Sequence, residues 1–252
     1  MSVEVLNELR SLGQKYIALK KFEQSLESKI RKGIDVDDLY ESVTSTIVEI
    51  QRIASKLVKE EPIYANWLHY VKGVGISHAL SLYGYIDFNK AKTVSSIWTY
   101  GGLVNTDTYS REFKGALIRI GMSLLGIRKI TPATYTRYEF PRGGKYAKYF
   151  VYRRKEADTK YPDWTNKHRF WHAMRMMLKM FTAHYFIVYK WLYEKEAYIP
   201  YPIKLVLEGK LNSHKHLYLP FVDTYLNLEW LTALENEYIK IGVQTRREPL
   251  TL

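Results

Sequence analysis

Residues 67–82 contain the feature that most constrains the fold, because two glycines separated by one valine stand between two apolar patterns of helical spacing. Gly73 and Gly75 permit a positive φ at a tight turn, and neither places a Cβ between the backbone and an approaching group. Val74 can fill the gap between the two helices, and Ala79 is small where they would cross. The segment therefore predicts a helix, a short hairpin and a second helix, the arrangement called helix-hairpin-helix.

The second helix of this pair begins where an anion is expected to bind. The first N–H groups of a helix have no partner within it, and the helix macrodipole adds positive charge at that end. An ordinary tight turn between two helices uses the same glycine pattern, so that alternative stays open at this point. The residues predicted to contact phosphate here are Lys72, Gly73, Val74, Gly75, Ile76 and Ser77.

The N-terminal part of the chain predicts two helices. An apolar stripe over 3–31 that includes Phe22 marks the first, and Gly33 is expected to end it in a left-handed conformation. Asp35 is expected to be the N-cap of the second. The apolar residues of the second helix recur with a period of seven and are Val36, Val43, Ile50 and Leu57, joined by Leu39, Ile47 and Ile53. Such a repeat is typical of a helical hairpin or coiled coil, and it fits both a hairpin within one chain and a homodimer.

Helical spacing continues through the rest of the chain, and no run of residues predicts a strand. The expected segments are a helix over 115–125, a segment over 137–160 with a flexible basic loop at 142–145, a long helix from Thr165 or Asn166 to about Ala197, and a last amphipathic stretch over 221–241. We predict an all-α fold with an N-terminal helical hairpin or coiled coil, a helix-hairpin-helix domain and a basic helical C-terminal region. The expected division of the chain is 1–60, 61–197 and 198–252.

The chain is strongly basic, and its charge is concentrated in one part. It holds 38 Lys and Arg against 26 Asp and Glu, a net charge of +12, with a pI near 9.5. Residues 110–195 contain 19 of the basic residues and only 6 of the acidic ones, so the remainder of the chain is close to neutral. Such an excess attracts polyanions, of which nucleic acid is the commonest and an anionic membrane surface is the rival.

Several classes of protein are excluded by composition. The 252 residues contain no cysteine, which excludes a disulfide scaffold, a thiolate zinc site and a cysteine nucleophile. The N-terminal segment lacks the apolar core of a signal peptide, and no apolar run approaches the ~18 residues of a membrane span. We therefore expect a cytoplasmic protein without a membrane partner. The absence of cysteine and the many Tyr, Ile, Lys and Glu residues also suit an organism of hot environments.

A second group of residues is expected to contact nucleic acid downstream of the hairpin. These residues are Arg142, Lys145, Arg153, Arg154, Lys155, His168, His172, Arg175 and Lys179. A short run of charged residues is usually just a face exposed to water, so the prediction depends on how many such residues occur together. His168 and His172 lie four positions apart, a spacing that metal ligands use, but no third ligand follows and His214 and His216 add none. We predict no metal and no cofactor, with room only for a monovalent cation at the hairpin.

Three motifs in this order resemble a known family. They are Val71-Lys72-Gly73-Val74-Gly75, then Ile97-Trp98-Thr99-Tyr100-Gly101-Gly102-Leu103, then His172-Ala173-Met174-Arg175-Met176-Met177-Leu178-Lys179-Met180-Phe181 with His184 and Trp191 beyond. Over residues 36–195 the chain is similar to the C-terminal half of the Piv-type insertion-sequence transposases, the recombinases that include the bridge-RNA-guided enzymes. Truncated archaeal and archaeal-virus relatives carry the same order. The resemblance implies a coiled coil, a helix-hairpin-helix domain and a closing helical region.

The chain departs from that family where the chemistry lies. Family enzymes carry an N-terminal RuvC-like domain with four metal-binding acids, and too few residues precede the predicted coiled coil here to form it. The family's catalytic serine follows the Gly-Leu pair in a Gly-rich and basic stretch. Here that stretch is shortened, and Ser110 is only a loose positional candidate. The resemblance therefore implies a recombinase-derived DNA-binding protein of a mobile genetic element without catalytic machinery.

Three functional hypotheses follow. The first is a non-catalytic protein that grips the backbone of duplex DNA and forms a homodimer through its N-terminal helices. The second is a reduced recombinase or nuclease that uses Ser110 or the acids of a partner. The third is a structural nucleoprotein that coats the DNA of a virus or plasmid. RNA stays an alternative ligand in each, because contacts to phosphates alone discriminate poorly.

Overall fold

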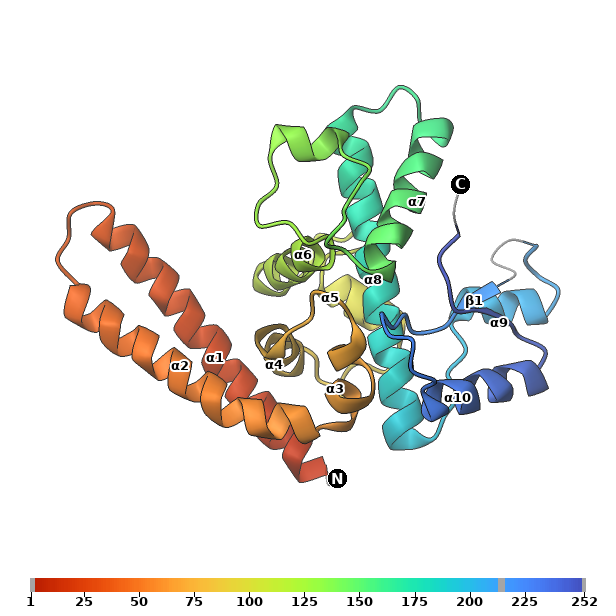
Figure 1. Cartoon of the computed structure of the whole chain (residues 1–252), viewed down its shortest axis with the longest axis horizontal. Helices are drawn as coiled ribbons and strands as arrows, with labels where there is room; N and C mark the ends of the chain where they lie inside the picture. The colour runs from red at the N-terminus through yellow and green to blue at the C-terminus, as the bar shows by residue number, and fades with distance from the viewer. Residues whose placement is uncertain (1–2, 213–215, 251–252) are drawn as a thin grey trace. The chain divides into compact units, whose positions relative to one another are not determined.

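The computed structural model of the chain describes residues 3–212 and 216–250 and is helical nearly throughout (Figure 1). Within these residues there are ten α-helices, and the only sheet is one pair of three-residue strands. The predicted all-α class is confirmed. None of the described helices is both long enough and apolar enough to cross a membrane.

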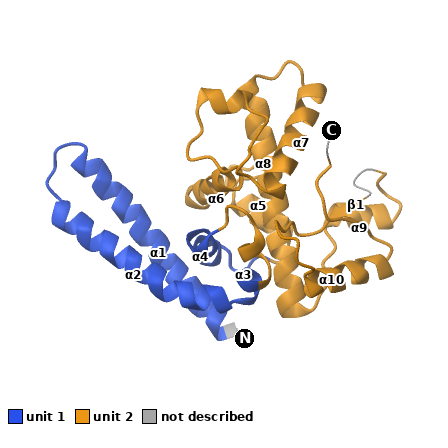
Figure 2. Cartoon of the chain, viewed as in Figure 1, with its two compact units in different colours: residues 1–65, 75–91 blue, residues 66–74, 92–252 orange. Residues whose placement is uncertain are grey.

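The chain divides into two compact units (Figure 2). Unit 1 comprises residues 1–65 and 75–91, and unit 2 comprises residues 66–74 and 92–252. The units cut across the expected three-part division, because the second helix of the predicted hairpin pair packs with the two N-terminal helices. The chain passes from unit 2 back to unit 1 between Val74 and Gly75, so each unit contains one half of the predicted hairpin.

Unit 1 is built on the predicted helical hairpin. Its elements are α1 (Val3–Ile30), α2 (Asp37–Glu60), α3 (Pro62–Asn66), which ends where unit 2 begins, and α4 (Ile76–Tyr85). Gly33 lies in the turn between α1 and α2 with a φ of +75°, as predicted. The N-cap position of α2 belongs to Val36, which makes no side-chain cap hydrogen bond, so the prediction of Asp35 as the cap is wrong.

Two glycines let α1 and α4 cross with their backbones in contact. A Cβ added to Gly13 would lie 2.7 Å from the backbone nitrogen of Gly84, and one added to Gly84 would lie 2.7 Å from the carbonyl carbon of Gly13. Neither position has room for a side chain, because these backbone atoms of the other helix cannot rotate away. This close crossing fixes α4 on the hairpin, and with it the position of the predicted anion-binding amides relative to unit 1.

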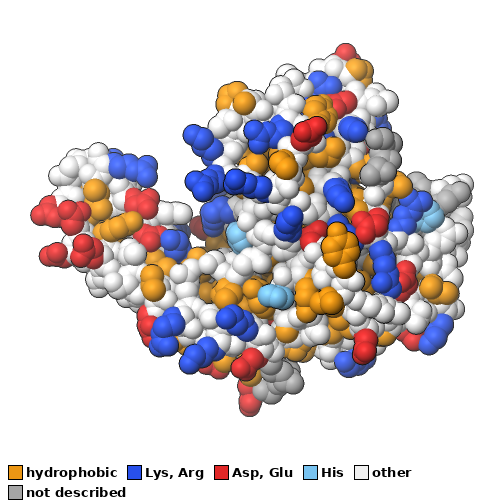
Figure 3. Space-filling view, in the orientation of Figure 1, with side chains coloured by type: hydrophobic (Ala, Val, Ile, Leu, Met, Phe, Trp, Pro, Cys, Tyr) orange, Lys and Arg blue, Asp and Glu red, His pale blue; other side chains and the backbone are white. Residues whose placement is uncertain are grey.

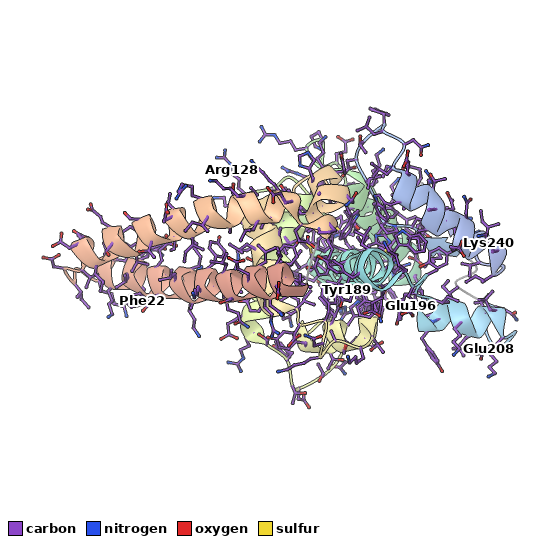
Figure 4. The ribbon with its side chains drawn as sticks, turned by 90° about the horizontal axis from the view of Figure 1, so that it is seen from below. Phe22, Arg128, Tyr189, Glu196, Glu208 and Lys240 are labelled. Carbon is purple, nitrogen blue, oxygen red and sulfur yellow. The ribbon has the colours of Figure 1, made fainter. Side chains whose placement is uncertain are left out.

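The apolar seam of α2 is rotated from the predicted one. The residues buried along α2 are Val43, Ile47, Ala54 and Val58. Leu39 and Ile53, which were expected in the seam, are 46% and 42% exposed. Phe22 of α1, also expected inside, is 42% exposed and lies on the side of α1 away from α2 (Figure 4). A repeat of seven predicts a seam but leaves open which of two adjacent apolar columns forms it, because both columns obey the same period.

Unit 2 contains the remaining elements of the chain. They are η1 (Leu68–Tyr70), α5 (Val94–Tyr100), α6 (Arg111–Leu124), η2 (Pro132–Thr136), α7 (Lys145–Lys160), α8 (Asn166–Tyr189), η3 (Lys190–Glu194), α9 (Tyr201–Leu207), β1 (His216–Tyr218), α10 (Glu229–Lys240) and β2 (Gln244–Arg246). The strands β1 and β2 pair in parallel, with His216 opposite Gln244.

Helix α8 is the centre of unit 2. Thr165 caps it by accepting a hydrogen bond from the N–H of His168 at 3.2 Å, as the sequence predicts. Every residue from Phe181 to Val188 is buried, and a helix buried on all sides lies in a core. The helices α5, α6 and α7 pack on it. The α-helical part ends at Tyr189 and a π-helical turn follows to Glu194, so the expected end near Ala197 is a few residues too late.

The C-terminal part of the chain belongs to the core of unit 2. The expected helix over 221–241 begins only at Glu229, because backbone groups before it are bonded to other elements. The indole Nε1 of Trp67 donates to the carbonyl of Phe221 at 3.0 Å, and the N–H of Asp223 donates to the carbonyl of Tyr70 at 2.7 Å. Phe221 itself is fully buried. A helix through these residues would break both hydrogen bonds, which explains the extended backbone.

Candidate nucleic-acid interface

The unit 2 half of the hairpin is held on α6. Gly73 has a φ of +93°, and a Cβ added there would collide with the backbone of Ser123. The hydroxyl of Ser123 donates a hydrogen bond of 2.6 Å to the carbonyl of Gly73. Gly73 therefore has two reasons to be glycine, its backbone conformation and its packing, and its predicted positive φ is confirmed. Val74 is buried and Lys72 is exposed, so Lys72 alone of the two presents its side chain to solvent.

The unit 1 half of the hairpin is open. Gly75 has a φ of −104° and a ψ of 179°, an extended conformation that any residue adopts, so its predicted positive φ is wrong. Nothing lies within 4 Å of a Cβ added to Gly75. Folding does not explain a glycine here, and the open space beside it is what the predicted approach of a phosphate requires.

The first amides of α4 are available to an anion. Among the described residues, none accepts a hydrogen bond from the N–H of Gly75, Ile76 or Ser77, whereas the N–H groups of His78 and Ala79 bond to the carbonyl of Gly75. The helix has ten residues, enough to develop a dipole at this end. The hydroxyl oxygen of Ser77 accepts from Gln51 Nε2 at 2.7 Å.

Asp223 is a structural residue of unit 2 that the sequence did not reveal. One of its carboxylate oxygens accepts from the N–H of Lys72 at 2.8 Å, and the other accepts from the N–H of Lys145 at 2.7 Å, at the start of α7. A Cβ on Gly144 would collide with the same carboxylate. The segment expected to be a flexible basic loop at 142–145 is therefore a packed turn, and the N–H of Lys72 is already occupied.

Arg154 does not belong to the predicted basic surface. Its side chain is fully buried, and its guanidinium donates to the carbonyl and the side-chain oxygen of Asn166, both at 2.9 Å, and to Asp158 at 3.4 Å. These bonds join α7 to the start of α8. A buried guanidinium needs such partners, so the role of Arg154 is to hold the two helices together.

The other predicted cations of α7 and of the turn before it differ in how far their side chains are exposed to solvent. Lys145 forms an ion pair with Glu248 at 2.5 Å, and Arg153 forms one with Glu156 at 2.7 Å. Both cations are partly buried. The remaining two predicted residues, Arg142 and Lys155, are exposed. Arg142 and Lys155 have the accessibility that a phosphate contact needs. Lys145 and Arg153 would have to share their charge between a phosphate and a carboxylate.

One face of α8 carries positive charge beside a histidine. His172, Arg175 and Lys179 follow one another on that face, and Arg175 is exposed. Burial, then Arg175 and Arg153, lower the pKa of His172 below its usual value. Burial and then Arg175 likewise lower the pKa of Lys179, whose ammonium also lies 5.0 Å from the ring centre of Trp98. The cations Arg175 and Lys179 repel each other, and an anion placed between them would relieve that repulsion.

His168 lies at the start of the same helix, in a stack of rings. Its imidazole is parallel to the indole of Trp164, with ring centres 4.0 Å apart, and Trp164 stacks on Tyr161 at the same separation. His168 is exposed, while His172 meets Trp164 edge-on. No group of three or more His, Cys, Asp or Glu residues suited to a metal occurs in the part of the chain that the structure describes. His214 lies outside that part.

Ser110, the loose candidate for a nucleophile, is the N-cap of α6. Its hydroxyl oxygen accepts from the N–H of Phe113 at 3.1 Å, and the hydroxyl lies 3.5 Å from the carboxylate of Glu112. Capping alone accounts for a serine at this position.

Further exposed cations of unit 2 were counted in the sequence but not singled out. Arg119 on α6 and Arg128, Lys129 and Arg137 beyond it are exposed, and no described carboxylate forms an ion pair with them. Figure 3 shows Lys and Arg side chains gathered over the part of unit 2 that holds α6 and the segment leading to η2. The charge of a segment was readable from the sequence, whereas which of its residues share a face was not.

The charge divides between the units. Unit 1 contains 11 basic and 12 acidic residues, and unit 2 contains 27 basic and 14 acidic residues, which gives net charges of −1 and +13. The whole excess therefore belongs to one compact unit. Comparison of the chain with protein families, with curated proteins and with solved structures finds no match. The resemblance to the Piv-type transposases depends on the quoted motifs alone.

Proposed function

We propose that the chain is a non-catalytic DNA-binding protein whose unit 2 binds the phosphate backbone of a duplex. The observation that carries this proposal is the net charge of +13 on unit 2 beside −1 on unit 1. Duplex DNA presents one negative charge per ~1.7 Å of its axis, and binding releases the counterions condensed on it. Contacts of this kind position a protein without reading bases, so we expect little sequence preference.

The face of α8 that contains Arg175 and Lys179 supplies the central contact in this proposal. Their mutual repulsion is a cost to the free protein that a phosphate oxygen removes. The exposed cations Arg142 and Lys155 add charge at other points of unit 2. The open amides at the start of α4, in unit 1, are proposed as a separate phosphate contact and are tested separately.

A homodimer through unit 1 is part of the proposal. Phe22, Leu39 and Ile53 leave apolar surface on the helical hairpin, each between 42% and 46% exposed. Helices commonly associate through exposed apolar side chains of this kind. The origin of the chain from a transposase of a mobile element is proposed from the quoted motifs.

The test of unit 2 is binding to a labelled random-sequence duplex, measured by fluorescence anisotropy. Arg175→Glu should weaken binding at least about tenfold at low salt and flatten the slope of log K against log salt by about one, the effect of losing one phosphate contact. Lys56→Glu makes a charge reversal of the same size on an exposed residue of α2, and it should change the affinity less than about twofold. Equal losses in the two variants, or no wild-type binding at about 50 mM salt, would contradict the proposal.

The test of the hairpin is Gly75→Val in the same assay. Because Gly75 has an extended backbone and open space beside it, the variant should fold with an unchanged circular dichroism spectrum. We expect its duplex affinity to fall several-fold, because the new side chain would occupy the position of the phosphate. An unchanged affinity would remove the hairpin from the interface and leave the proposal for unit 2 standing. Duplex RNA and single-stranded DNA as competitors identify the preferred nucleic acid.

A further inference from the structure

A cavity of about 350 Å³ lies in unit 2 beside one face of α7. Small-molecule sites occupy about 300–1,000 Å³, so the cavity is large enough for a small ligand. It opens between α7, the segment before that helix and the C-terminal segment at Leu250. The side chains that line the cavity include Tyr138, Phe140, Lys148, Val151, Tyr152 and Lys155.

The aromatic walls of the cavity are fixed from behind. The hydroxyl of Tyr138 donates to the carboxylate of Asp158, and the guanidinium of the buried Arg154 lies 5.2 Å from the centre of the Tyr138 ring. Phe140 meets the buried ring of Phe150 edge-on, with centres 5.4 Å apart. Rings held in this way lose little conformational freedom when a ligand binds, so they suit a flat apolar partner.

Among the described residues that line the cavity, the charged ones are Lys148 and Lys155. Lys148 and Lys155 lie seven positions apart on α7, which places them on one face and about 10.5 Å apart along the axis. Val151 and Tyr152 lie between them on the same face. None of the described residues that line the cavity is acidic. A ligand that fits must therefore combine a flat ring with a negative charge.

The base of the cavity is backbone. Gly143 and Gly144 line it, and neither has room for a side chain. A Cβ on Gly143 would lie 3.1 Å from the carbonyl oxygen of Leu124, and one on Gly144 would collide with Asp223. The packing that anchors the start of α7 thus also keeps the cavity open at this point.

We propose that this cavity binds one nucleotide unit, with its base against the aromatic walls and its phosphate between Lys148 and Lys155. Base–aromatic stacking and a charge-assisted phosphate contact are the interactions that these side chains offer. Two sources present this chemistry, a free mononucleotide and an unpaired nucleotide in a DNA strand. The second source rests on the proposed DNA binding of unit 2, and the first does not.

The first arm of the test uses thymidine monophosphate as the probe, with thymidine and inorganic phosphate beside it, in isothermal titration calorimetry. Val151→Trp fills the space for the ring. Lys148→Glu reverses a charge, and because Lys148 is exposed, this substitution leaves the core intact. Each should weaken binding of the monophosphate at least about tenfold, the usual scale for losing a contact to a charged group. Lys204→Glu, the same change on an exposed residue of α9 outside the cavity, should weaken it less than about twofold.

The second arm compares a fully paired duplex with one that carries a single unpaired thymine. If a strand is the source, wild type should prefer the unpaired nucleotide, and Val151→Trp should abolish the preference while leaving affinity for the paired duplex unchanged. A wild type without saturable monophosphate binding below about 1 mM and without this preference would overturn the inference. So would inorganic phosphate that binds as tightly as the monophosphate. If the wild-type protein does not bind the paired duplex, that result would instead contradict the proposed function.

Discussion

Protonation of His184 is predicted to destabilise unit 2 in mild acid. His184 is fully buried on α8, where its Nε2 lies 3.0 Å from the carbonyl oxygen of Tyr218 and its Nδ1 lies 2.7 Å from the hydroxyl of Tyr146. Because a carbonyl can only accept, Nε2 carries the proton and Nδ1 accepts from Tyr146. The neutral ring therefore satisfies both partners. A second proton on Nδ1 would make both ring nitrogens donors, so the hydroxyl of Tyr146 would have to turn from donor to acceptor.

The magnitude follows from the pKa of this one group. Burial lowers the pKa of His184 from 6.5 to about 3. The unfolded chain therefore binds a proton that the folded chain excludes, and stability rises with pH between these two values. Stability is complete above pH 6.5 and is lost as the pH falls toward 3. Each pH unit is worth about 1.36 kcal/mol, so at pH 5 the loss is about 2 kcal/mol relative to pH 7.

Urea unfolding at pH 7 and pH 5, followed by tryptophan fluorescence, measures this loss. All 6 tryptophans lie in unit 2, so the signal reports that unit alone. His184→Gln is the control, because its amide can accept from Tyr146 and donate to Tyr218 but does not titrate. Wild type should lose about 2 kcal/mol more than the variant on acidification, since the other histidines contribute equally to both. Equal losses would refute the assignment of the acid sensitivity to His184.

Three further predictions concern single contacts. Asp223→Ala removes the acceptor of two backbone N–H groups and should lower the free energy of unfolding of unit 2 by about 3 kcal/mol in the urea assay, and a loss below about 1 kcal/mol would contradict its anchoring role. Arg154→Lys should cost about 3 kcal/mol, because an ammonium cannot reproduce the forked contact with the start of α8, and a neutral effect would mean that those bonds contribute nothing net. Leu39→Lys combined with Ile53→Lys should convert the proposed dimer to a monomer in sedimentation velocity, and a wild type that is monomeric at all concentrations would refute dimerisation through this face.

Features that depend on neighbours in the sequence were predicted well. Gly33 ends α1 with a positive φ, and Thr165 caps α8, because turns and caps are decided by one or two residues acting on their own backbone. The buried face of α8, which includes Phe170, Met174 and Phe181, also follows from spacing alone. For the turn and the cap, the chemical signal and its structural consequence lie within one turn of helix, and for α8 the signal is a period that repeats along the helix.

Features that depend on distant partners were missed. The burial of Arg154 is decided by Asn166 across the turn between α7 and α8, and a run of three basic residues gives no sign of which one points inward. Asp223 is a lone acid after an apolar run, and its partners Lys72 and Lys145 are 151 and 78 positions away. A hydrogen bond between residues this far apart in the chain produces no periodic pattern in a single sequence, so it could not be predicted.

The segregation of charge is itself an argument about function. A fold gains nothing from placing cations side by side, because each raises the cost of its neighbours. Burial and then Arg175 lower the pKa of Lys179, so the neighbouring cation adds to the cost of burying this charge. Acidic residues were not scarce, since unit 1 contains 12 of them at near neutrality and several in unit 2 form ion pairs. The exposed cations of α6 and α8 stand apart from these acids. The repulsion within unit 2 is therefore a cost that stability does not explain, and the proposed binding of a polyanion would recover it.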